Sequence, residues 1–174
     1  MNHSDTIKDK YRKQIINHSS HTLTQVEALS IFTSPIFQKA QHIGCYKALK
    51  PEIDIENLLK LFVKNKKKIY LPIPNEKNTL SFAEWKLNEP LIFRHKCWVP
   101  SSTKTMNVKS LDCIIVPCLG VDIKHQRLGR GSGYYDRTIS RSCNTVGIIS
   151  PFQQINESIG YSHDITLKEI IVID

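Results

Sequence analysis

The chain has 174 residues, 40% of them hydrophobic and 23% charged, a composition typical of an ordinary folded protein and not of a disordered one. No apolar run approaches the roughly 20 residues that cross a bilayer, and the first residues lack the apolar stretch of a secretion signal. We therefore expect a cytoplasmic protein with a single domain over residues 1–174, whose net charge of +8 favours anionic partners.

The first helix is predicted near the start of the chain, after Ser4 or Asp5. Ile7, Tyr11 and Ile15 recur there at four-residue steps and form one apolar stripe. We expect this stripe to pack against the body of the protein.

Two further helices are predicted in the first half of the chain. Thr24-Gln-Val-Glu27 is typical of a capping box, and Ser34-Pro35 ends that helix and restarts it, because proline suits a first helical position. Asp54 is expected to cap the next helix. The inner face of that helix is formed by Ile55, Leu58, Leu59 and Phe62. The basic run 64–68 closes it, where cations complement the helix dipole; a nucleic-acid patch is the alternative.

Short apolar segments alternate with these helices and predict strands. They cover residues 43–46, 68–72, 80–85, 113–119, 145–149 and 169–173. Segment 80–85 alternates, which predicts a strand exposed on one face. Segment 113–119 is apolar throughout, as in a central parallel strand, and a helix near 134–141 follows the glycine loop. The alternation predicts an α/β fold, a Rossmann-like three-layer sandwich with a mostly parallel central sheet.

The cysteines indicate a reduced protein. They are Cys45, Cys97, Cys113, Cys118 and Cys143. Their number is odd and no Cys-x-x-Cys occurs, so we expect neither a disulfide framework nor a zinc site. Cys45, Cys113 and Cys118 lie in apolar runs, where a reduced cysteine behaves as a small hydrophobic residue.

The most informative segment is the loop 127–137, Arg-Leu-Gly-Arg-Gly-Ser-Gly-Tyr-Tyr-Asp-Arg. Alternate glycines allow positive φ and let successive amide groups line an anion site. The loop precedes a predicted helix, whose first amides also favour phosphate. For the glycines alone, a flexible surface turn is an equal alternative. The three arginines and the Tyr-Tyr-Asp-Arg ending favour a loop that binds the phosphates of a nucleotide, ATP above all.

This loop, preceded by a Val-Pro strand and an aspartate, closely resembles the signature of the 5-formyltetrahydrofolate cyclo-ligase family. Further matches occur in order along nearly the whole chain. They are Lys8-x-x-x-Arg12, the strand with Tyr46 followed by Glu52-Ile-Asp, Tyr70-Leu-Pro-Ile-Pro74, and His163-Asp164. The glycine loop is highly specific, whereas the other motifs are weak singly and persuasive together.

The resemblance implies an enzyme that uses ATP and Mg²⁺. Its substrate would be 5-formyltetrahydrofolate, with or without a polyglutamate tail, and its products 5,10-methenyltetrahydrofolate, ADP and phosphate. Transfer of the γ-phosphoryl group to the formyl oxygen would create a leaving group, and the neighbouring folate nitrogen would then close the ring. We expect a monomer, with neither a membrane nor nucleic acid as partner.

The resemblance also implies which residues bind ATP. They are Lys8, Arg12, Arg127, Leu128, Gly129, Arg130, Gly131, Ser132, Gly133, Tyr134 and Tyr135. Arg127 and Arg130 are the expected phosphate ligands, because a planar guanidinium binds phosphate in a bidentate way. For Lys8 and Arg12, a solvated helix edge is the alternative.

Metal and catalytic residues are implied in the same way. Asp136 would hold Mg²⁺, with Asp164 as a second ligand, since Mg²⁺ needs only one or two protein carboxylates. A helix cap for Asp136 and a turn for Asp164 are the alternatives. The expected catalytic residues are Arg127, Tyr134 and Asp136.

The folate site would be formed by other parts of the chain. Glu52 would accept hydrogen bonds from folate donors with its two carboxylate oxygens. Tyr46, Trp85 and Tyr134 would line the substrate site, and ordinary core packing is the alternative for Tyr46 and Trp85.

Three positions depart from the family pattern. His125 stands where the family has glycine, Ile55 stands where threonine is common, and residues 96–100 replace a Gly-Ile-x-Glu-Pro segment. These changes touch the folate side more than the ATP side. Two alternatives therefore stay open beside the cyclo-ligase: a catalytically silent relative that binds nucleotide or RNA through the same basic cleft, and an unrelated ATP-dependent phosphoryl-transfer enzyme.

Overall fold

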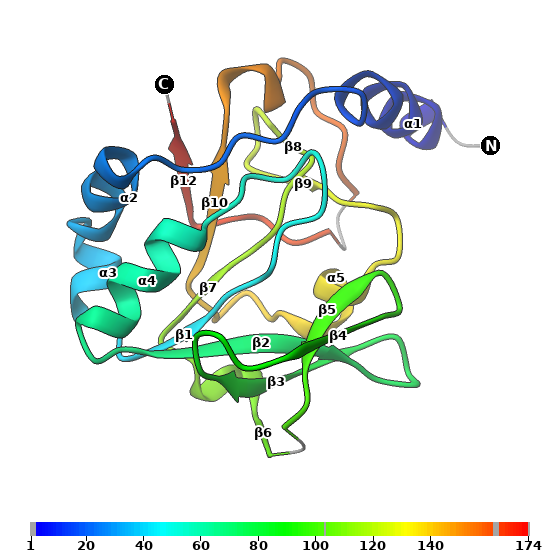
Figure 1. Ribbon diagram of the computed structural model, residues 1–174. Coiled ribbons are helices and arrows are strands. Elements are labelled where there is room, and N and C mark those ends of the chain that lie inside the picture. Colours follow the sequence, from blue (N-terminus) through cyan, green and yellow to red (C-terminus); the bar gives the residue numbers. More distant parts are fainter. Residues whose placement is uncertain (1–2, 103, 162–163, 174) are drawn as a thin grey trace.

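A computed structural model describes residues 3–102, 104–161 and 164–173. Its centre is a seven-stranded sheet with the strand order β12-β10-β7-β1-β2-β3-β6 (Figure 1). In chain order these strands are β1 (His42–Gly44), β2 (Lys68–Pro74), β3 (Leu80–Trp85), β6 (Thr105–Met106), β7 (Cys113–Ile115), β10 (Thr145–Ile149) and β12 (Glu169–Val172). The strands from β12 to β2 run parallel, and β3 is antiparallel to both its neighbours. The predicted α/β fold with a mostly parallel sheet is confirmed.

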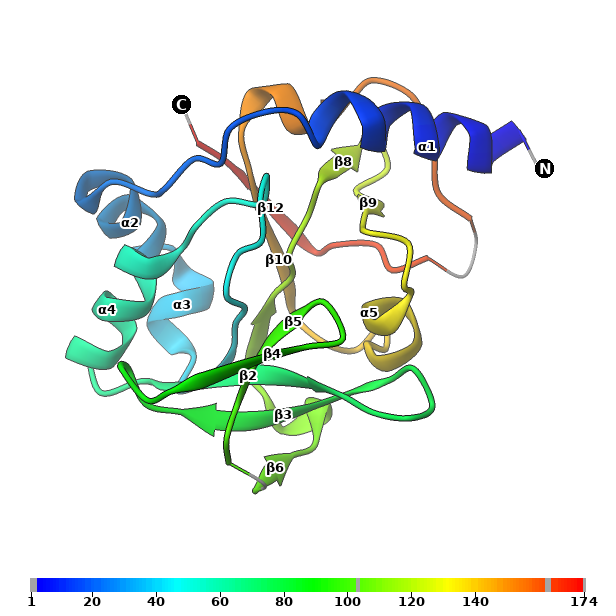
Figure 2. The same ribbon diagram turned by 45° about the vertical axis from the view of Figure 1, so that its right-hand side comes forward.

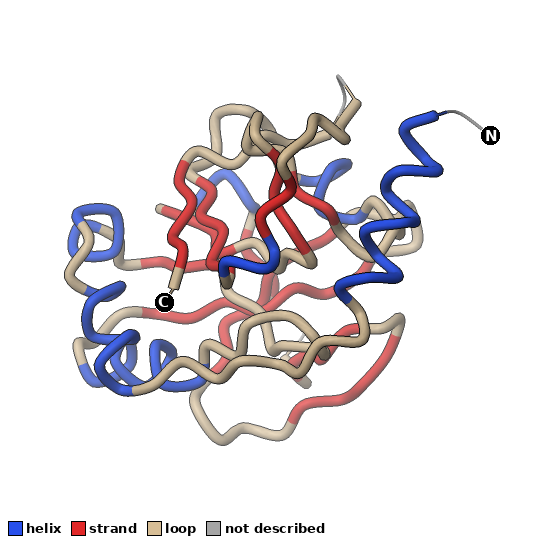
Figure 3. The backbone as a smooth tube through the Cα atoms, turned by 90° about the horizontal axis from the view of Figure 1, so that it is seen from above, coloured by secondary structure: helices blue, strands red, loops and turns tan. Residues whose placement is uncertain are grey.

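Helices cover both faces of this sheet. They are α1 (His3–Ile15), α2 (Gln25–Phe32), α3 (Pro35–Lys39), α4 (Glu56–Lys64), α5 (Tyr134–Thr138) and the 3-10 turns Val108–Ser110 and Pro151–Gln153. Figures 1 and 3 show α2, α3 and α4 gathered on one side, and α1 apart from them. Phe37 and Phe62 fill the core on that side, whereas Tyr135 of α5 packs with Ile114 and Ile139 on the other.

The predicted helix signals agree with the structure, with one correction. Thr24 and Glu27 form both hydrogen bonds of a capping box, and Pro35 stands at the start of α3. Asp54 does not hold the cap position, which belongs to Ile55; its Oδ1 instead accepts a hydrogen bond from the Glu56 amide. Asp54 thus lies one residue before the cap position, and its carboxylate still accepts a hydrogen bond from an amide of the first turn that has no partner within the helix.

The predicted apolar stripe of α1 packs as expected. Ile15 is buried with Leu119 and Leu128, and Ile7 and Tyr11 lie against the same small core. Since Leu119 and Leu128 flank the segment that leads to the glycine loop, this packing holds α1 beside the loop.

Strand β3 differs from its prediction, because it is not exposed on one face. Four of its six residues are buried. The reason is the hairpin of β4 (Leu91–Arg94) and β5 (Cys97–Pro100), which crosses in front of β2 and β3 in Figure 2. Val99 of this hairpin packs with Ile73 and Ala83, so the alternating face is covered by tertiary contact.

The predicted strand 113–119 lies inside the sheet, between β1 and β10, but only Cys113–Ile115 pairs as a strand. The glycine loop does not follow it directly. A small sheet intervenes, formed by β8 (Gly120–Asp122), β9 (Arg127–Leu128) and, later in the chain, β11 (Gln154–Ile155). This sheet carries the chain away from the buried strand and brings Arg127 to the start of the loop.

Among the described residues, no helix combines the length and apolar character needed to cross a membrane. The described cysteines are all free thiols, and burial raises the pKa of Cys113 and Cys118 to about 12.

The assignment of residues 1–174 to one domain stays a prediction.

Candidate functional site

Two cavities meet at the glycine loop. The first, named here the cationic cavity, lies between α1 and the loop, and its wall includes Lys8, Arg12, Arg127, Gly129, Gly131, Gly133, Arg137, Asp136 and Asp164. The second, the apolar cavity, lies on the other side of the loop, and its wall includes Tyr46, Glu52, Pro72, Leu80, Pro117, Arg130, Tyr134 and Tyr135. Arg127, Gly129 and Gly133 line both, so the loop forms the partition.

The glycines of the partition are required by its conformation. Gly131 and Gly133 have φ values of 90° and 65°, in the left-handed region that other residues rarely adopt. A Cβ at Gly129 would lie 2.5 Å from Nη1 of Arg127. Side chains at these positions would strain the backbone or displace Arg127, so the pattern of glycines serves both the turn and the arginine.

Arg127 is the central cation of the partition. Its Nη2 donates to Oδ2 of Asp136 over 3.0 Å, and Nη1 donates to the Pro117 carbonyl. The guanidinium carbon lies 5.0 Å from the ring centre of Tyr135. Its Nε is buried and has no hydrogen-bond partner in the part of the chain that the structure describes. A buried donor without an acceptor is costly, because it has given up its hydrogen bond to water without replacing it.

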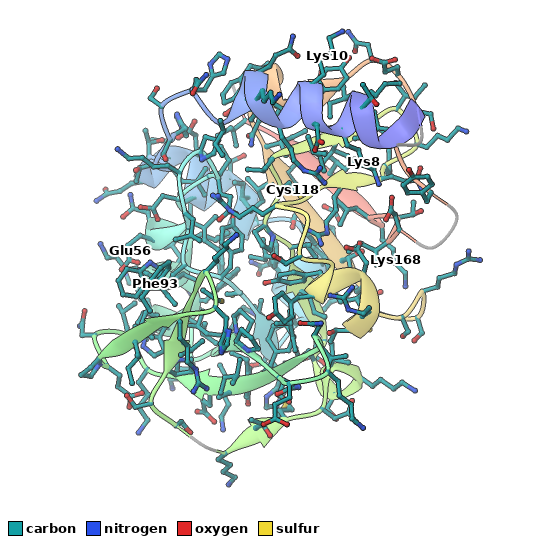
Figure 4. All side chains as sticks on the ribbon, turned by 90° about the vertical axis from the view of Figure 1, so that its right-hand side faces the viewer. Lys8, Lys10, Glu56, Phe93, Cys118 and Lys168 are labelled. Atoms are coloured by element: carbon teal, nitrogen blue, oxygen red, sulfur yellow. The ribbon has the colours of Figure 1, made fainter. Side chains whose placement is uncertain are left out.

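Helix α1 contributes two cations to the cationic cavity. The Nζ of Lys8 lies 2.6 Å from Oδ2 of Asp164 and 4.4 Å from the ring centre of Tyr161. Arg12 donates from Nε to the Gly129 carbonyl. In Figure 4, Lys8 lies on the side of α1 that faces the molecule, whereas Lys10 lies on the outer side. Both residues of the Lys8-x-x-x-Arg12 motif therefore reach the glycine loop or its neighbours.

The two aspartates of the cationic cavity offer oxygen ligands. Asp136 accepts from Arg127 and, over 3.3 Å, from the Ile165 amide, and Asp164 accepts from Lys8 and the Tyr161 amide. The described residues contain no group of three or more His, Cys, Asp or Glu that could hold a metal. Two carboxylates fit the needs of Mg²⁺, which takes one or two protein carboxylates and keeps its other positions for phosphate oxygens and water.

Arg130, an expected phosphate ligand, lines the apolar cavity and not the cationic cavity. Its Nε donates over 2.8 Å to Oε1 of Glu52, and its Nη2 donates to the carbonyls of Leu49 and Lys50. Glu52 is buried, and its Oε2 accepts from the Leu49 amide. The reason is tertiary: the segment before α4 passes close to the loop and supplies a carboxylate and two carbonyls.

The aromatic residues divide between cavity and core. Tyr134 and Tyr135 line the apolar cavity, as does Tyr46, whose hydroxyl donates to the Ile53 carbonyl. Burial first, and then the charge of Glu52, raises the pKa of Tyr46 well above its ordinary value. Trp85 is different, because it packs in the core, donates from Nε1 to the Glu89 carbonyl and lies outside the wall of the cavity. These contacts favour core packing, the alternative stated for Trp85.

The turn of the β4–β5 hairpin adds wall residues that were not predicted. His95, Lys96 and Cys97 line the apolar cavity, and Lys47 joins them from the segment after β1. Burial, and to a lesser degree Glu52, raises the pKa of the Cys97 thiol to about 12. A sequence signal pointed to Lys96 and Cys97 as wall residues, because they lie in segment 96–100, which departs from the family pattern. His163, which was matched together with Asp164, lies outside the described residues.

Comparisons with known proteins identify the family of the chain. The model of the 5-formyltetrahydrofolate cyclo-ligase family matches residues 7–173. The 5-formyltetrahydrofolate cyclo-ligase of Escherichia coli is 25% identical over 169 residues, 94% of this chain and 87% of that protein. The enzyme of that name from Mycolicibacterium smegmatis is 33% identical over 96 residues, 53% of this chain and 45% of that protein.

The fold has solved counterparts as well. The NMR structure of Aquifex aeolicus 5,10-methenyltetrahydrofolate synthetase superposes with a TM-score of 0.77 at 24% identity. The match covers 97% of this chain and 89% of that one. At this identity the likeness carries the fold, an α/β arrangement around a mostly parallel sheet.

Proposed function

The chain belongs to the 5-formyltetrahydrofolate cyclo-ligase family, and from that premise we propose that its two cavities form one active site. The family activity is the ATP-using conversion of 5-formyltetrahydrofolate into 5,10-methenyltetrahydrofolate. In our proposal the cationic cavity takes the phosphates of ATP, and the apolar cavity takes the reduced pterin with its formyl group. The shared wall, the glycine loop, brings the γ-phosphoryl group next to the formyl oxygen.

The observation that carries this proposal is the unpaired Nε of Arg127. Arg127 lines both cavities, and its buried Nε has no acceptor among the described residues. A phosphate oxygen would satisfy it by a charge-assisted bond. Charge spreads over the equatorial oxygens during phosphoryl transfer, so an arginine fixed at this place also stabilises the transition state.

The surrounding residues would divide the remaining work. Lys8 and Arg12 approach the same cavity from α1 and add positive charge for the β- and γ-phosphates. Tyr134, which begins α5 and lines the apolar cavity, would align the substrate against the loop. Holding two reactants in one geometry supplies a large part of such a rate acceleration.

The balance of the chemistry requires no group beyond these reactants. The formyl oxygen attacks the γ-phosphorus and ADP leaves. The neighbouring folate nitrogen then attacks the formyl carbon, and the carbon–oxygen bond breaks with its electrons leaving on phosphate. The proton of the attacking nitrogen passes to the released phosphate as the ring closes. Asp136 and Asp164 would hold Mg²⁺, which would offset phosphate charge when bound. On binding of the nucleotide, Lys8 and Arg127 can exchange these carboxylates for phosphate oxygens.

The decisive experiment is an assay of the purified protein. Formation of 5,10-methenyltetrahydrofolate is followed by its absorbance, from 5-formyltetrahydrofolate with Mg²⁺, in the presence and absence of ATP. We expect product only with ATP, together with equimolar ADP and phosphate. A folded protein that makes no product but binds RNA tightly would instead be the catalytically silent relative.

A further inference from the structure

Arg130 joins the two cavities through the loop that separates them. The residue lies between Gly129 and Gly131, whose backbone lines the cationic cavity, yet its own side chain lines the apolar cavity. Its guanidinium uses two nitrogens for three acceptors: Glu52 Oε1 at 2.8 Å, the Leu49 carbonyl at 2.7 Å and the Lys50 carbonyl at 2.6 Å. The nucleotide loop is thus tied to the segment that carries Glu52.

Glu52 depends on this contact. Its side chain is 7% exposed and that of Arg130 is 26% exposed, so the carboxylate is the more buried partner of the ion pair. Its second oxygen accepts from the Leu49 amide. A buried carboxylate needs a paired cation and hydrogen-bond donors to remain charged and fixed in place. A carboxylate has about four acceptor positions, so capacity remains for donors of a bound substrate.

We propose, resting on the proposed function, that Arg130 is a positioning residue that couples the two binding events. It is not a phosphate ligand. When nucleotide orders the glycine loop, the guanidinium fixes segment 49–52 and with it the carboxylate that meets the folate. The nucleotide therefore tightens folate binding, and by thermodynamic reciprocity the folate tightens nucleotide binding by the same factor.

The geometry indicates which substitution removes the coupling between nucleotide and folate binding but keeps the positive charge at position 130. Lysine at position 130 keeps a cation that can reach Glu52, but one ammonium cannot reproduce the planar fork that also holds the Leu49 and Lys50 carbonyls. Arg130→Lys should therefore keep the fold and lose the coupling. Arg130→Ala removes both. Lys60→Ala, on the exposed side of α4, removes one positive charge elsewhere and is the matched control.

The test measures the dissociation constant of 5-formyltetrahydrofolate by calorimetry, with and without saturating Mg²⁺ and the β,γ-imido analogue of ATP. In the unsubstituted protein and in Lys60→Ala we expect the analogue to tighten folate binding at least about fivefold, the lower end of common couplings. In Arg130→Lys and Arg130→Ala we expect less than about twofold, with analogue affinity measured without folate nearly unchanged.

Three results would overturn this assignment. They are an equal coupling factor in the Arg130 variants, no coupling in the unsubstituted protein, and a large loss of analogue affinity in Arg130→Lys, which would make Arg130 a phosphate ligand. Failure of the proposed function is distinguishable, because the unsubstituted protein would then form no methenyl product from 5-formyltetrahydrofolate and ATP, whereas failure of the coupling alone leaves product formation intact.

Discussion

At the scale of single residues, Glu52 and Asp136 are two carboxylates on opposite sides of one loop. Glu52 lines the apolar cavity and Asp136 the cationic cavity. We predict that Glu52→Gln raises the KM for folate or lowers turnover while ATP binding stays nearly intact. Asp136→Asn should instead weaken the Mg²⁺ dependence and slow phosphoryl transfer. Both changes preserve size, so separate titrations of the two ligands isolate the effect of charge; indistinguishable variants would contradict this division.

Arg127 should be the strongest single determinant of nucleotide affinity. Its replacement by alanine removes a charge-assisted bond to phosphate, which is worth about 1.5–3 kcal/mol or roughly ten- to a hundredfold in affinity. We expect calorimetry to show this loss for ATP and a much smaller one for folate. Thermal melting of the variant is the control for folding, because the Asp136 carboxylate loses its ion-pair partner and the variant could be less stable. Unchanged ATP affinity in a folded variant would remove Arg127 from the phosphate site.

His125 holds a backbone conformation that suits glycine. Its φ is 60°, in the turn between β8 and β9, where its amide donates to Asp122 and its carbonyl accepts from Leu167. Left-handed geometry costs a side-chain-bearing residue about 1–2 kcal/mol. Glycine removes this cost, but it also lowers stability by about 0.4–1 kcal/mol, because it gives the unfolded chain more conformational freedom.

We therefore predict that His125→Gly raises the free energy of unfolding by no more than about 1.6 kcal/mol, the largest difference between these opposing effects. His125→Val should instead destabilise the protein, since a β-branched residue is a genuine outlier at this φ. Urea unfolding of both variants provides the comparison. A valine variant as stable as the glycine variant would contradict the expected strain.

At the scale of elements, the capping box of α2 is a local device that should act without touching the site. Thr24 Oγ1 accepts from the Glu27 amide, and Glu27 Oε2 accepts from the Thr24 amide. We predict that Thr24→Ala costs about 0.5–2 kcal/mol of stability and leaves the kinetic constants unchanged. Denaturant unfolding and the absorbance assay measure the two effects, and altered kinetics would show that α2 influences the cavities.

The same box predicts a pH dependence. The Thr24 amide, followed by its hydroxyl, lowers the pKa of Glu27 below its ordinary value. A lowered folded-state pKa gives stability that is present above the unfolded pKa and is lost as the pH falls through the folded value. The destabilisation by Thr24→Ala should therefore be full at neutral pH and shrink in the acid range below the ordinary carboxyl pKa. An effect that grows on acidification would reverse the sign of this linkage.

At the scale of the whole molecule, two hydrophobic cores pack against opposite faces of the seven-stranded sheet. One contains Cys113 and Val146 from one face of β7 and β10, and the other contains Ile114 and Ile149 from the opposite face of these strands. We predict a single cooperative unfolding transition, as proposed for one domain. Tryptophan fluorescence, which includes that of buried Trp85, and far-ultraviolet circular dichroism should give coincident curves. Mg²⁺ with ATP should shift both curves to higher temperature together, and two separate transitions would contradict the single domain.

The residue sequence by itself determined the local features and pointed to the family. The capping box, the restart at Pro35 and the stripe of α1 depend on side chains within one or two helical turns, so their physics is complete in a short segment. The glycine loop is equally local, because positive φ at Gly131 and Gly133 is a property of those residues. Resemblance at this loop pointed to the family that the family model then matched.

Only the tertiary structure decided which cavity each site residue faces. Arg130 meets Glu52 from 78 positions away, Trp85 is closed off in the core, and β3 is covered by a hairpin that follows it. No periodic pattern or motif spacing in the sequence predicts these contacts. They arise because burial of apolar faces brings distant segments together, and charged groups then pair with whatever donors and acceptors lie within reach.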